Sequence, residues 1–373
     1  MKYSLFLILC CLLYLSLGCG GSEHPVADPS TDGNTDTMNG TADYSLNIAD
    51  TVSQDLQADF NIYTVDDISA SSSGYIALLD GSRATVTVID SSGTFVSAGG
   101  LGNGPGEYQQ PKAVSVSEDG SVAVSDFMGG IVRILEPALD SYVDIEGFIM
   151  ANPGKMILLN SGGIAGMRIM FTSEDGETAI GHQTALWAGT GSEPSTMYSE
   201  NMHTFSLNDF GWSLIAPYPM TCRADGVVYT AAVSTERYVL NSIAPDGTFR
   251  WSVERPFERT EKTQEEIDIE KDIVTRLMQQ SEHQADYTPE TYNYAVTDLA
   301  LGPNGNLWAR RPGTEKTFFD VYEVSEGDYL FSVSSDYDYE LLEVTPGGIL
   351  AVLPGESQSL VLMDMEQNPP TSN

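Results

Sequence analysis

The stretch that decides the fold is GGLGNGPGEYQQPKAVSVSEDGSVAVSDFMGGIVRILE, residues 99–136. It contains a glycine-rich loop and then two short runs in which apolar and small polar residues alternate, separated by the turn Asp119–Gly120. Alternation with a period of two gives each run one buried face, and a glycine permits the positive φ that a tight hairpin turn needs. The stretch therefore predicts a β-hairpin that follows a glycine-rich loop.

The same unit recurs along the 373-residue chain. Repeated short strands with regular turns indicate an all-β array. Residues 44–367 allow about 43 residues for each of six units once two long insertions are set aside, which is the size of a four-stranded propeller blade. We therefore predict an all-β fold, a six-bladed β-propeller over residues 44–367, followed by a short tail at 368–373. The glycines expected to close the six turns are Gly74, Gly120, Gly154, Gly226, Gly305 and Gly348.

The first strand of the predicted ring has a special role. Residues 44–52, YSLNIADTV, alternate like a strand and are expected to complete the sheet formed by residues 339–366. Pairing between the two ends of the chain would close the ring and remove exposed sheet edges.

One insertion is predicted to be an amphipathic helix, at about residues 263–282. Thr263 and Glu266 have the spacing of a capping box, and apolar residues repeat every four positions from Ile269 to Ile273 and beyond. We expect this helix either to lie on the rim of the propeller or to dock a partner protein.

The N-terminus reads as a targeting signal. Residues 1–18 combine Lys2 with an uncharged apolar run that is too short for a membrane-spanning helix, a pattern typical of a secretory signal peptide. The ending LSLGC resembles the lipobox of bacterial lipoproteins, and this resemblance implies that Cys19 becomes the first mature residue and carries lipid. Residues 19–43 have few large apolar side chains and are predicted to form a flexible tether. We therefore expect an exported monomer that is lipid-anchored to the bacterial cell envelope, at the outer membrane.

The composition excludes one class of partner. The chain has 53 Asp and Glu residues against 17 Lys and Arg, a formal net charge of −36. Nucleic-acid binding needs a basic surface, so nucleic acid is not expected as a partner. The four His residues and the absence of HExxH or paired CxxC spacing predict neither a zinc site nor a cofactor.

Residues 99–136 resemble an NHL-type repeat. The pattern of that repeat is a glycine-rich loop, a polar residue and an aromatic one, a proline, an Asp–Gly turn and an aspartate at the end of the second strand. The matching positions here include Glu107, Tyr108, Pro111 and Asp126. Residues 306–333 are similar to a blade of six-bladed β-propeller lipoproteins of bacteria. The resemblance implies a ring of blades around a central tunnel.

Three polar residues stand six positions after a predicted turn glycine, namely Asp80, Asp126 and Asn160. Equivalent positions in successive hairpins are expected to lie at one end of the ring, near its axis. Propellers of the lactonase type hold a divalent ion in the tunnel with carboxylate and asparagine ligands, so a resemblance to them implies a metal site here. The alternative is that these side chains cap the ends of the second strands, as the aspartate of NHL repeats does.

Arg311 takes the same position in a later hairpin, next to Arg310 and with Trp308 inside the strand. Arg311 is expected either to pair with Asp80 or Asp126 or to receive an anionic or sugar ligand. Aromatic side chains offer stacking surfaces for such a ligand.

The predicted function is a non-catalytic binding or scaffold module for an envelope protein or a small ligand. One alternative is a metal-dependent, lactonase-like hydrolase with its site in the central tunnel, and another is a purely structural envelope protein. Propellers host many functions, so the fold does not choose among the three. The candidate ligand-binding residues are Asp80, Glu107, Tyr108, Asp126, Asn160, Trp308, Arg310 and Arg311.

Overall fold

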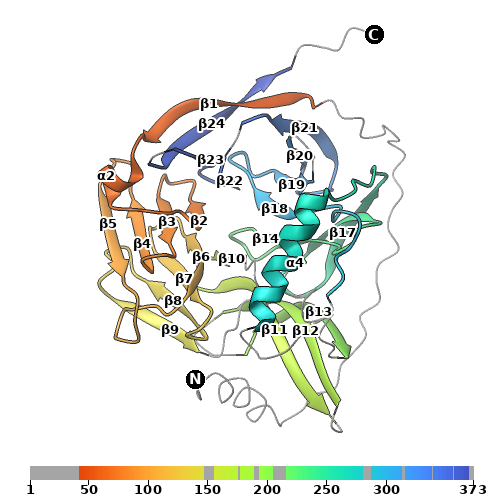
Figure 1. Ribbon diagram of the computed structural model, residues 1–373, viewed down its shortest axis with the longest axis horizontal. Helices are drawn as coiled ribbons and strands as arrows, with labels where there is room; N and C mark the ends of the chain where they lie inside the picture. Colours follow the sequence, from red (N-terminus) through yellow and green to blue (C-terminus); the bar gives the residue numbers. More distant parts are fainter. Residues whose placement is uncertain are drawn as a thin grey trace.

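The computed structural model shows a ring of β-sheets (Figure 1). Over the described residues, the strands form six four-stranded blades, which confirms the predicted fold class. The described residues are 42–146, 155–174, 177–188, 193–204, 216–279, 287–312, 316–337, 339–355 and 357–368.

The first three blades each run outward from an inner strand near the ring axis to an outer strand at the rim. Blade 1 consists of β2 (Asp67–Ala70), β3 (Ile76–Asp80), β4 (Thr85–Ile89) and β5 (Phe95–Gly99). Blade 2 consists of β6 (Pro111–Val116), β7 (Val122–Asp126), β8 (Ile131–Leu135) and β9 (Tyr142–Glu146). Blade 3 consists of β10 (Met156–Leu158), β11 (Ile164–Glu174), β12 (Glu177–Trp187) and β13 (Thr196–Thr204).

The other three blades follow the same plan, except that the last takes its outer strand from the N-terminal side of the chain. Blade 4 consists of β14 (Met220–Cys222), β15 (Val228–Ala231), β16 (Tyr238–Ile243) and β17 (Phe249–Arg255). Blade 5 consists of β18 (Asp298–Leu301), β19 (Leu307–Arg311), β20 (Thr317–Tyr322) and β21 (Tyr329–Ser335). Blade 6 consists of β22 (Leu341–Thr345), β23 (Gly348–Leu353), β24 (Ser359–Gln367) and β1 (Tyr44–Ser53).

Strand β1 closes the ring, as the sequence predicts. It pairs antiparallel with β24 along its whole length and, at Tyr44 and Ser45, parallel with β21. Blades 5 and 6 therefore form one eight-stranded sheet. The inner strands β2, β6, β10, β14, β18 and β22 contact one another in ring order, and β22 returns to β2.

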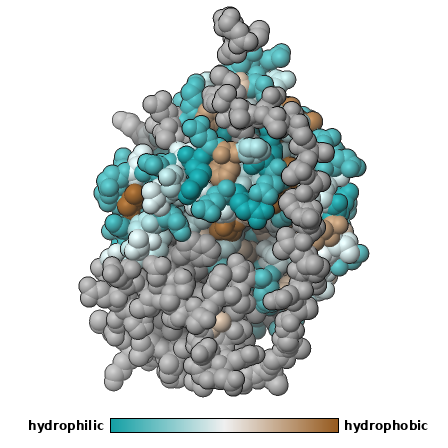
Figure 2. Space-filling view, turned by 90° about the vertical axis from the view of Figure 1, so that its right-hand side faces the viewer, coloured by the Kyte–Doolittle hydropathy of each residue, from teal (hydrophilic) through white to brown (hydrophobic). Residues whose placement is uncertain are grey.

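The apolar core lies mainly between neighbouring blades. Between blades 1 and 2, for example, buried Val86 and Val88 pack with Val114 and Val124. The second strands β3 and β7 are therefore buried on both faces and not on one as the alternation predicts, whereas the outer strands β5 and β9 are mostly exposed. Hydrophilic side chains dominate the described surface in Figure 2, and the hydrophobic ones are scattered.

The predicted turn of blade 3 was misplaced. The turn between β10 and β11 is closed by the amide of Gly162, which donates to the carbonyl of Leu159 at 2.9 Å. Gly162 has a φ of +79°, the left-handed region that favours glycine. Gly154, the glycine expected there, precedes β10 and lies outside the described residues. Asn160 consequently stands inside the turn and not six positions beyond it.

The predicted helix is present as α4 (Gln264–Gln279), and the structure also contains a short helix elsewhere, α2 (Leu56–Phe60), that was not predicted. The capping box forms, because the amide of Thr263 donates to Glu266 at 2.6 Å and the amide of Glu266 donates to Thr263 Oγ1 at 3.2 Å. Glu270 faces inward, where it forms a buried ion pair with Lys262, the residue before the N-cap, whereas Ile269 is exposed. None of the described helices combines the length and the apolar character that crossing a membrane requires.

Candidate functional site

The six inner strands surround a central tunnel with a volume of about 760 Å³. They all run in the same direction along it, so one end of the tunnel is lined by the hairpin turns between first and second strands. We call this the hairpin end. Its lining includes Ser72, Glu118, Asn160, Ala224 and Pro346.

The inner edge of each blade has no partner strand. Side-chain oxygens of a neighbouring blade accept hydrogen bonds from some of the backbone amides along this edge. The amide of Val114 donates to Asp67 Oδ2 at 2.7 Å, and the amide of Val116 donates to Ser69 Oγ at 3.1 Å. A serine of β6 accepts from the amide of Leu158 in the same way, at 2.8 Å. Buried amides need such partners, which explains why hydroxyl and carboxyl groups line the tunnel.

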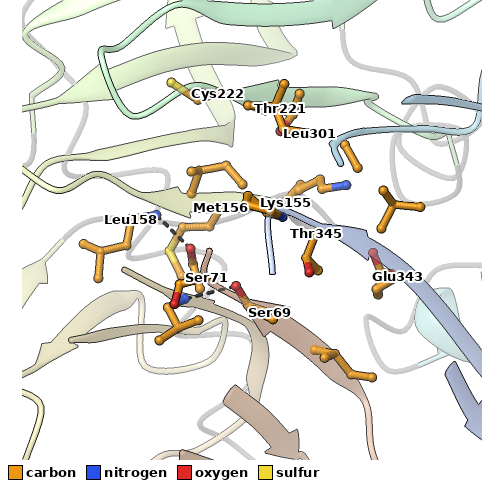
Figure 3. A pocket seen from close by; sticks show the side chains of 18 of the residues that line it. Ser69, Ser71, Lys155, Met156, Leu158, Thr221, Cys222, Leu301, Glu343 and Thr345 are labelled. Atoms are coloured by element: carbon orange, nitrogen blue, oxygen red, sulfur yellow. Dashed lines mark hydrogen bonds between the residues drawn. The ribbon is translucent and has the colours of Figure 1, made fainter. Parts of the chain in front are cut away.

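Charged side chains from four blades gather at the end of the tunnel where the inner strands begin. We call this the charged end. Lys155 Nζ donates to Asp298 Oδ1 at 2.7 Å and to the carbonyl of Leu299 at 2.5 Å. Lys155 belongs to blade 3 and Asp298 to blade 5, so this ion pair joins two blades that are not neighbours in the ring. Figure 3 shows Lys155 and Glu343 among the side chains that line the tunnel. The charged cluster consists of Asp67, Lys155, Asp298, Arg310 and Glu343.

Two carboxyl groups of the charged cluster have raised pKa values. Burial raises the pKa of Asp67 to about 7, although the amides of Val114 and Ile68 and the charge of Lys155 act against it. Burial also raises the pKa of Glu343 to about 8, and the attraction of Lys155 only partly offsets this effect. Both groups therefore bind protons in the neutral pH range.

The lysine of the cluster is stabilised in its charged form. Burial disfavours the ammonium group of Lys155, but the neighbouring carboxylates of Asp298 and Glu343 outweigh that effect and raise its pKa. When all five groups of the charged cluster are ionised, three carboxylates face two cations, which leaves one negative charge. Asp66 and Lys112 also line this end of the tunnel and have opposite charges, so they do not alter the excess of one negative charge.

The two predicted aspartates are used inside the fold. Asp126 is almost fully buried and accepts from the amides of Gln109 and Gln110 at 2.7 and 2.8 Å. Asp80 accepts from the amide of Tyr63 at 2.9 Å and from the Ser82 hydroxyl at 2.6 Å. Burial opposes ionisation of Asp80, but these hydrogen bonds prevail and lower its pKa. Each carboxylate joins the end of a second strand to the loop that enters its blade.

The residues predicted around the glycine-rich loop do not face the tunnel either. Glu107 accepts from the amide of Gly104 at 2.7 Å, within its own loop. The ring of Tyr108 is fully buried in the core between blades 1 and 2, and the guanidinium of Arg133 lies 5.1 Å from its centre. Trp308 is likewise a core residue, packed edge-on against Phe319.

The two predicted arginines have different roles. Arg311 does not pair with Asp80 or Asp126, because its Nε lies 2.8 Å from the buried carboxylate of Asp320. Arg310, one residue earlier, points to the other side of β19 and lines the charged end of the tunnel. Of the predicted set, only Arg310 and Asn160 line the tunnel.

The predicted convergence on one mouth is therefore wrong for most of these residues. Asn160 lies at the hairpin end and accepts from the amide of Glu118 at 3.5 Å, whereas Arg310 lies at the charged end. The physical reason is that the end of a second strand is one strand removed from the axis. Polar side chains there form hydrogen bonds with the turns and loops that surround them.

The prediction missed Asp67, Lys155, Asp298 and Glu343. A signal for them existed in the sequence: single charged residues interrupt or begin the short apolar inner strands, as in DLAL at Asp298 and LLEVT at Glu343. Charge inside a strand with two buried faces is costly unless it faces a polar cavity. In an array of blades, that cavity is the tunnel.

The geometry also bears on the predicted metal site. Asp80 and Asp126 are almost fully buried and do not line the tunnel, whereas Asn160 lies at its hairpin end. Among the described residues, no three His, Cys, Asp or Glu side chains are grouped so that they could hold a metal ion.

No protein-family model matches the chain, and no curated protein matches its sequence. Among solved structures, the chain is similar to a Bacteroides fragilis protein described as exported, with 12% identity, a TM-score of 0.49, and coverage of 87% of this chain and 96% of that one. It is also similar to the PQQ-bound aldose sugar dehydrogenase of Streptomyces coelicolor (11% identity, TM-score 0.46, 87% and 99% covered). A third similar structure is the calcium-binding protein regucalcin of Agrobacterium tumefaciens, with 9% identity, a TM-score of 0.42, and coverage of 88% of this chain and 97% of that one. At these identities the likeness concerns the fold alone.

The raised pKa of Glu343 predicts a specific dependence of stability on pH. The folded chain holds a proton that the unfolded chain releases above about pH 4.5, so folding stability falls as pH rises from about 5 to about 8. In Glu343→Gln that loss is absent. We expect the variant to match the wild type at pH 5 and to exceed it at pH 8.5 by about 1 to 2 kcal/mol, a figure lowered for screening by tunnel water.

Thermal and denaturant unfolding between pH 5 and pH 8.5 measures this difference. The control is Glu258→Gln, because Glu258 is exposed and lies outside the tunnel. Parallel stability profiles for the wild type and Glu343→Gln over the whole range would contradict the assignment.

Proposed function

We propose that this protein is an exported, lipid-anchored propeller that binds a small polar ligand in its central tunnel, without catalysing a reaction. The observation that carries the proposal is the charged cluster. Its side chains come from blades 1, 3, 5 and 6 and meet in one cavity, although they are far apart in the sequence.

The size and lining of the tunnel support a small ligand. Small-molecule sites in proteins have volumes of about 300 to 1,000 Å³ and combine apolar walls with a few convergent polar groups. The tunnel has this composition, since Met156, Leu158 and Leu301 alternate with the charged and hydroxyl side chains on its wall (Figure 3). Arg310 adds a guanidinium for which no hydrogen bond to a described residue is found.

A binding role suits this geometry better than metal-dependent hydrolysis. The hydrolase alternative places a divalent ion in the tunnel with Asp80, Asp126 and Asn160 as ligands, but of these three residues only Asn160 lines the tunnel. A binding module needs only a rigid cavity with oriented polar groups. The closed ring supplies that rigidity, because every inner strand is held between two neighbours.

The location of the protein is part of the proposal. It rests on the signal-like residues 1–18, on Cys19 in its lipobox-like context, and on the tether at 19–43, all but the last two residues of which lie outside the described part of the chain. The resemblance of one blade to NHL repeats remains a sequence-based interpretation.

Ligand retention tests the binding function. The full-length protein in detergent is dialysed against a defined mixture of neutral, anionic and cationic polar compounds, and the retained compounds are identified by mass spectrometry. We expect the wild type to retain at least one compound and Arg310→Gln to change its retention about tenfold, with less of an anionic or neutral compound, to which Arg310 can donate, and more of a cationic one, which Arg310 repels. The control is Arg276→Gln, an exposed arginine on α4. Retention of nothing by the wild type, or equal retention by wild type and Arg310→Gln, would reject the tunnel as the site.

Lipid anchoring is tested separately, in cells of the native host. We expect the wild-type protein to partition into the detergent phase of a membrane extract and Cys19→Ala to appear in the aqueous phase, because several acyl chains on one residue provide the membrane affinity. The control is Cys222→Ala, at the buried thiol of blade 4. Detergent-phase partition that survives the loss of Cys19 would refute the anchor.

A further inference from the structure

We infer that the tunnel ligand is a hydroxylated organic monocation, of the class of amino sugars and amino polyols, whose ammonium group binds between Asp67 and Glu343. This inference rests on the proposed function and specifies the chemistry of the same site. It follows from the charges of the cluster, its unused hydrogen-bond acceptors and the serine hydroxyls further along the tunnel wall.

The charge difference selects the sign of the ligand. Three carboxylates and two cations leave one negative charge in the fully ionised cluster. Adding one ammonium group makes the filled site neutral. An anion would instead increase the imbalance in a tunnel where water screens charge less than at the surface.

The contacts within the cluster select the position of the ammonium group. Asp298 already accepts from Lys155, at 2.7 Å. Glu343 lines the tunnel, and no hydrogen bond or direct ion pair to a described residue is found for its carboxylate. Asp67 has its oxygens on backbone amides, but a carboxylate oxygen accepts more than one hydrogen bond. The carboxylates of Asp67 and Glu343 therefore have unused acceptor capacity.

The side chains on the tunnel wall beyond the charged cluster indicate that the rest of the ligand carries hydroxyl groups. Ser69 stands two residues after Asp67 on the same face of β2, about 6.5 Å further along the tunnel. Ser69 Oγ accepts from the amide of Val116, and Ser115 Oγ accepts from the amide of Leu158. Each hydroxyl hydrogen is thus free to turn toward the tunnel. A polyol chain with its amine at one end can place hydroxyl groups at these serines.

Proton binding by the empty site agrees with this assignment. Asp67 faces Lys155 and Asp298, and Glu343 faces these two groups together with Arg310 and Asp67. With their pKa values raised to about 7 and about 8, the two carboxyl groups together hold about one proton at pH 7.5, which cancels the excess negative charge of the fully ionised cluster. An arriving ammonium group displaces such a proton, so binding near neutral pH releases protons and strengthens as pH rises from 6 to 8.

The test uses three compounds that share one six-carbon polyol chain and differ in charge: glucamine (1-amino-1-deoxysorbitol, cationic), sorbitol (neutral) and gluconate (anionic). Titration calorimetry of the full-length protein at pH 7.5, in phosphate and in MOPS buffer, gives both the affinity and the number of protons released. Tris is avoided because it is itself a hydroxylated ammonium ion. We expect glucamine to bind at least tenfold more tightly than sorbitol, with release of about half to one proton, and gluconate to bind least.

Two variants test whether glucamine binds at Glu343. We expect Glu343→Gln to lose at least tenfold in glucamine affinity and most of the proton release, while Glu258→Gln, at an exposed position outside the tunnel, behaves as the wild type. Asp67→Asn serves as the second variant if Glu343→Gln does not fold.

The outcomes separate this inference from the proposed function. If sorbitol or gluconate binds as tightly as glucamine, the assignment of an organic monocation is wrong and the tunnel remains a binding site. The same conclusion follows if sodium ions displace glucamine at concentrations similar to that of glucamine itself. The same holds if dialysis finds a retained ligand that is neutral or anionic. If no compound of any charge is retained by the wild type, the proposed function fails as well.

Discussion

A closed ring of blades leaves the inner edge of every sheet without a partner strand, and the rest of the structure depends on how that edge is satisfied. Backbone amides cannot be buried without acceptors. In this protein, Asp67 and Ser69 on β2 accept from amides of β6, and Ser115 on β6 accepts from an amide of β10. The tunnel is polar because these side chains hold the inner strands together.

The charged cluster adds side chains to the tunnel wall that are not needed as acceptors for the amides of the inner strands. Lys155 reaches from blade 3 to Asp298 on blade 5, and Glu343 is held nearby with a raised pKa. Burying a carboxyl group that lacks a direct partner costs stability, and polar groups that reduce stability are concentrated at binding sites. The buried ion pair of Arg311 and Asp320 is different, because it joins neighbouring strands of blade 5 and neither residue lines the tunnel.

Much of the fold could be predicted from the sequence, and little of the site could. Period-two alternation and turn glycines identify strands locally, and the pairing of β1 with β24 follows from the need to close the ring. The misplaced turn at Gly154 shows the limit, because two glycine-containing segments flank β10 and sequence alone did not separate them. Asp126 and Lys155 are both charged residues beside short strands, but only the three-dimensional ring shows that one faces a loop and the other the tunnel.

A double-mutant cycle across the tunnel, with Lys155→Met and Asp298→Asn and the free energy of unfolding as the readout, tests directly whether side chains of blades 3 and 5 meet at the charged end. The same cycle on the exposed pair Lys316 and Asp336 provides the reference. We expect a coupling of about 1 kcal/mol or more for the tunnel pair and about 0.5 kcal/mol or less for the exposed pair. Additive effects of the two tunnel substitutions would show that blades 3 and 5 do not meet there, and the charged cluster would lose its basis.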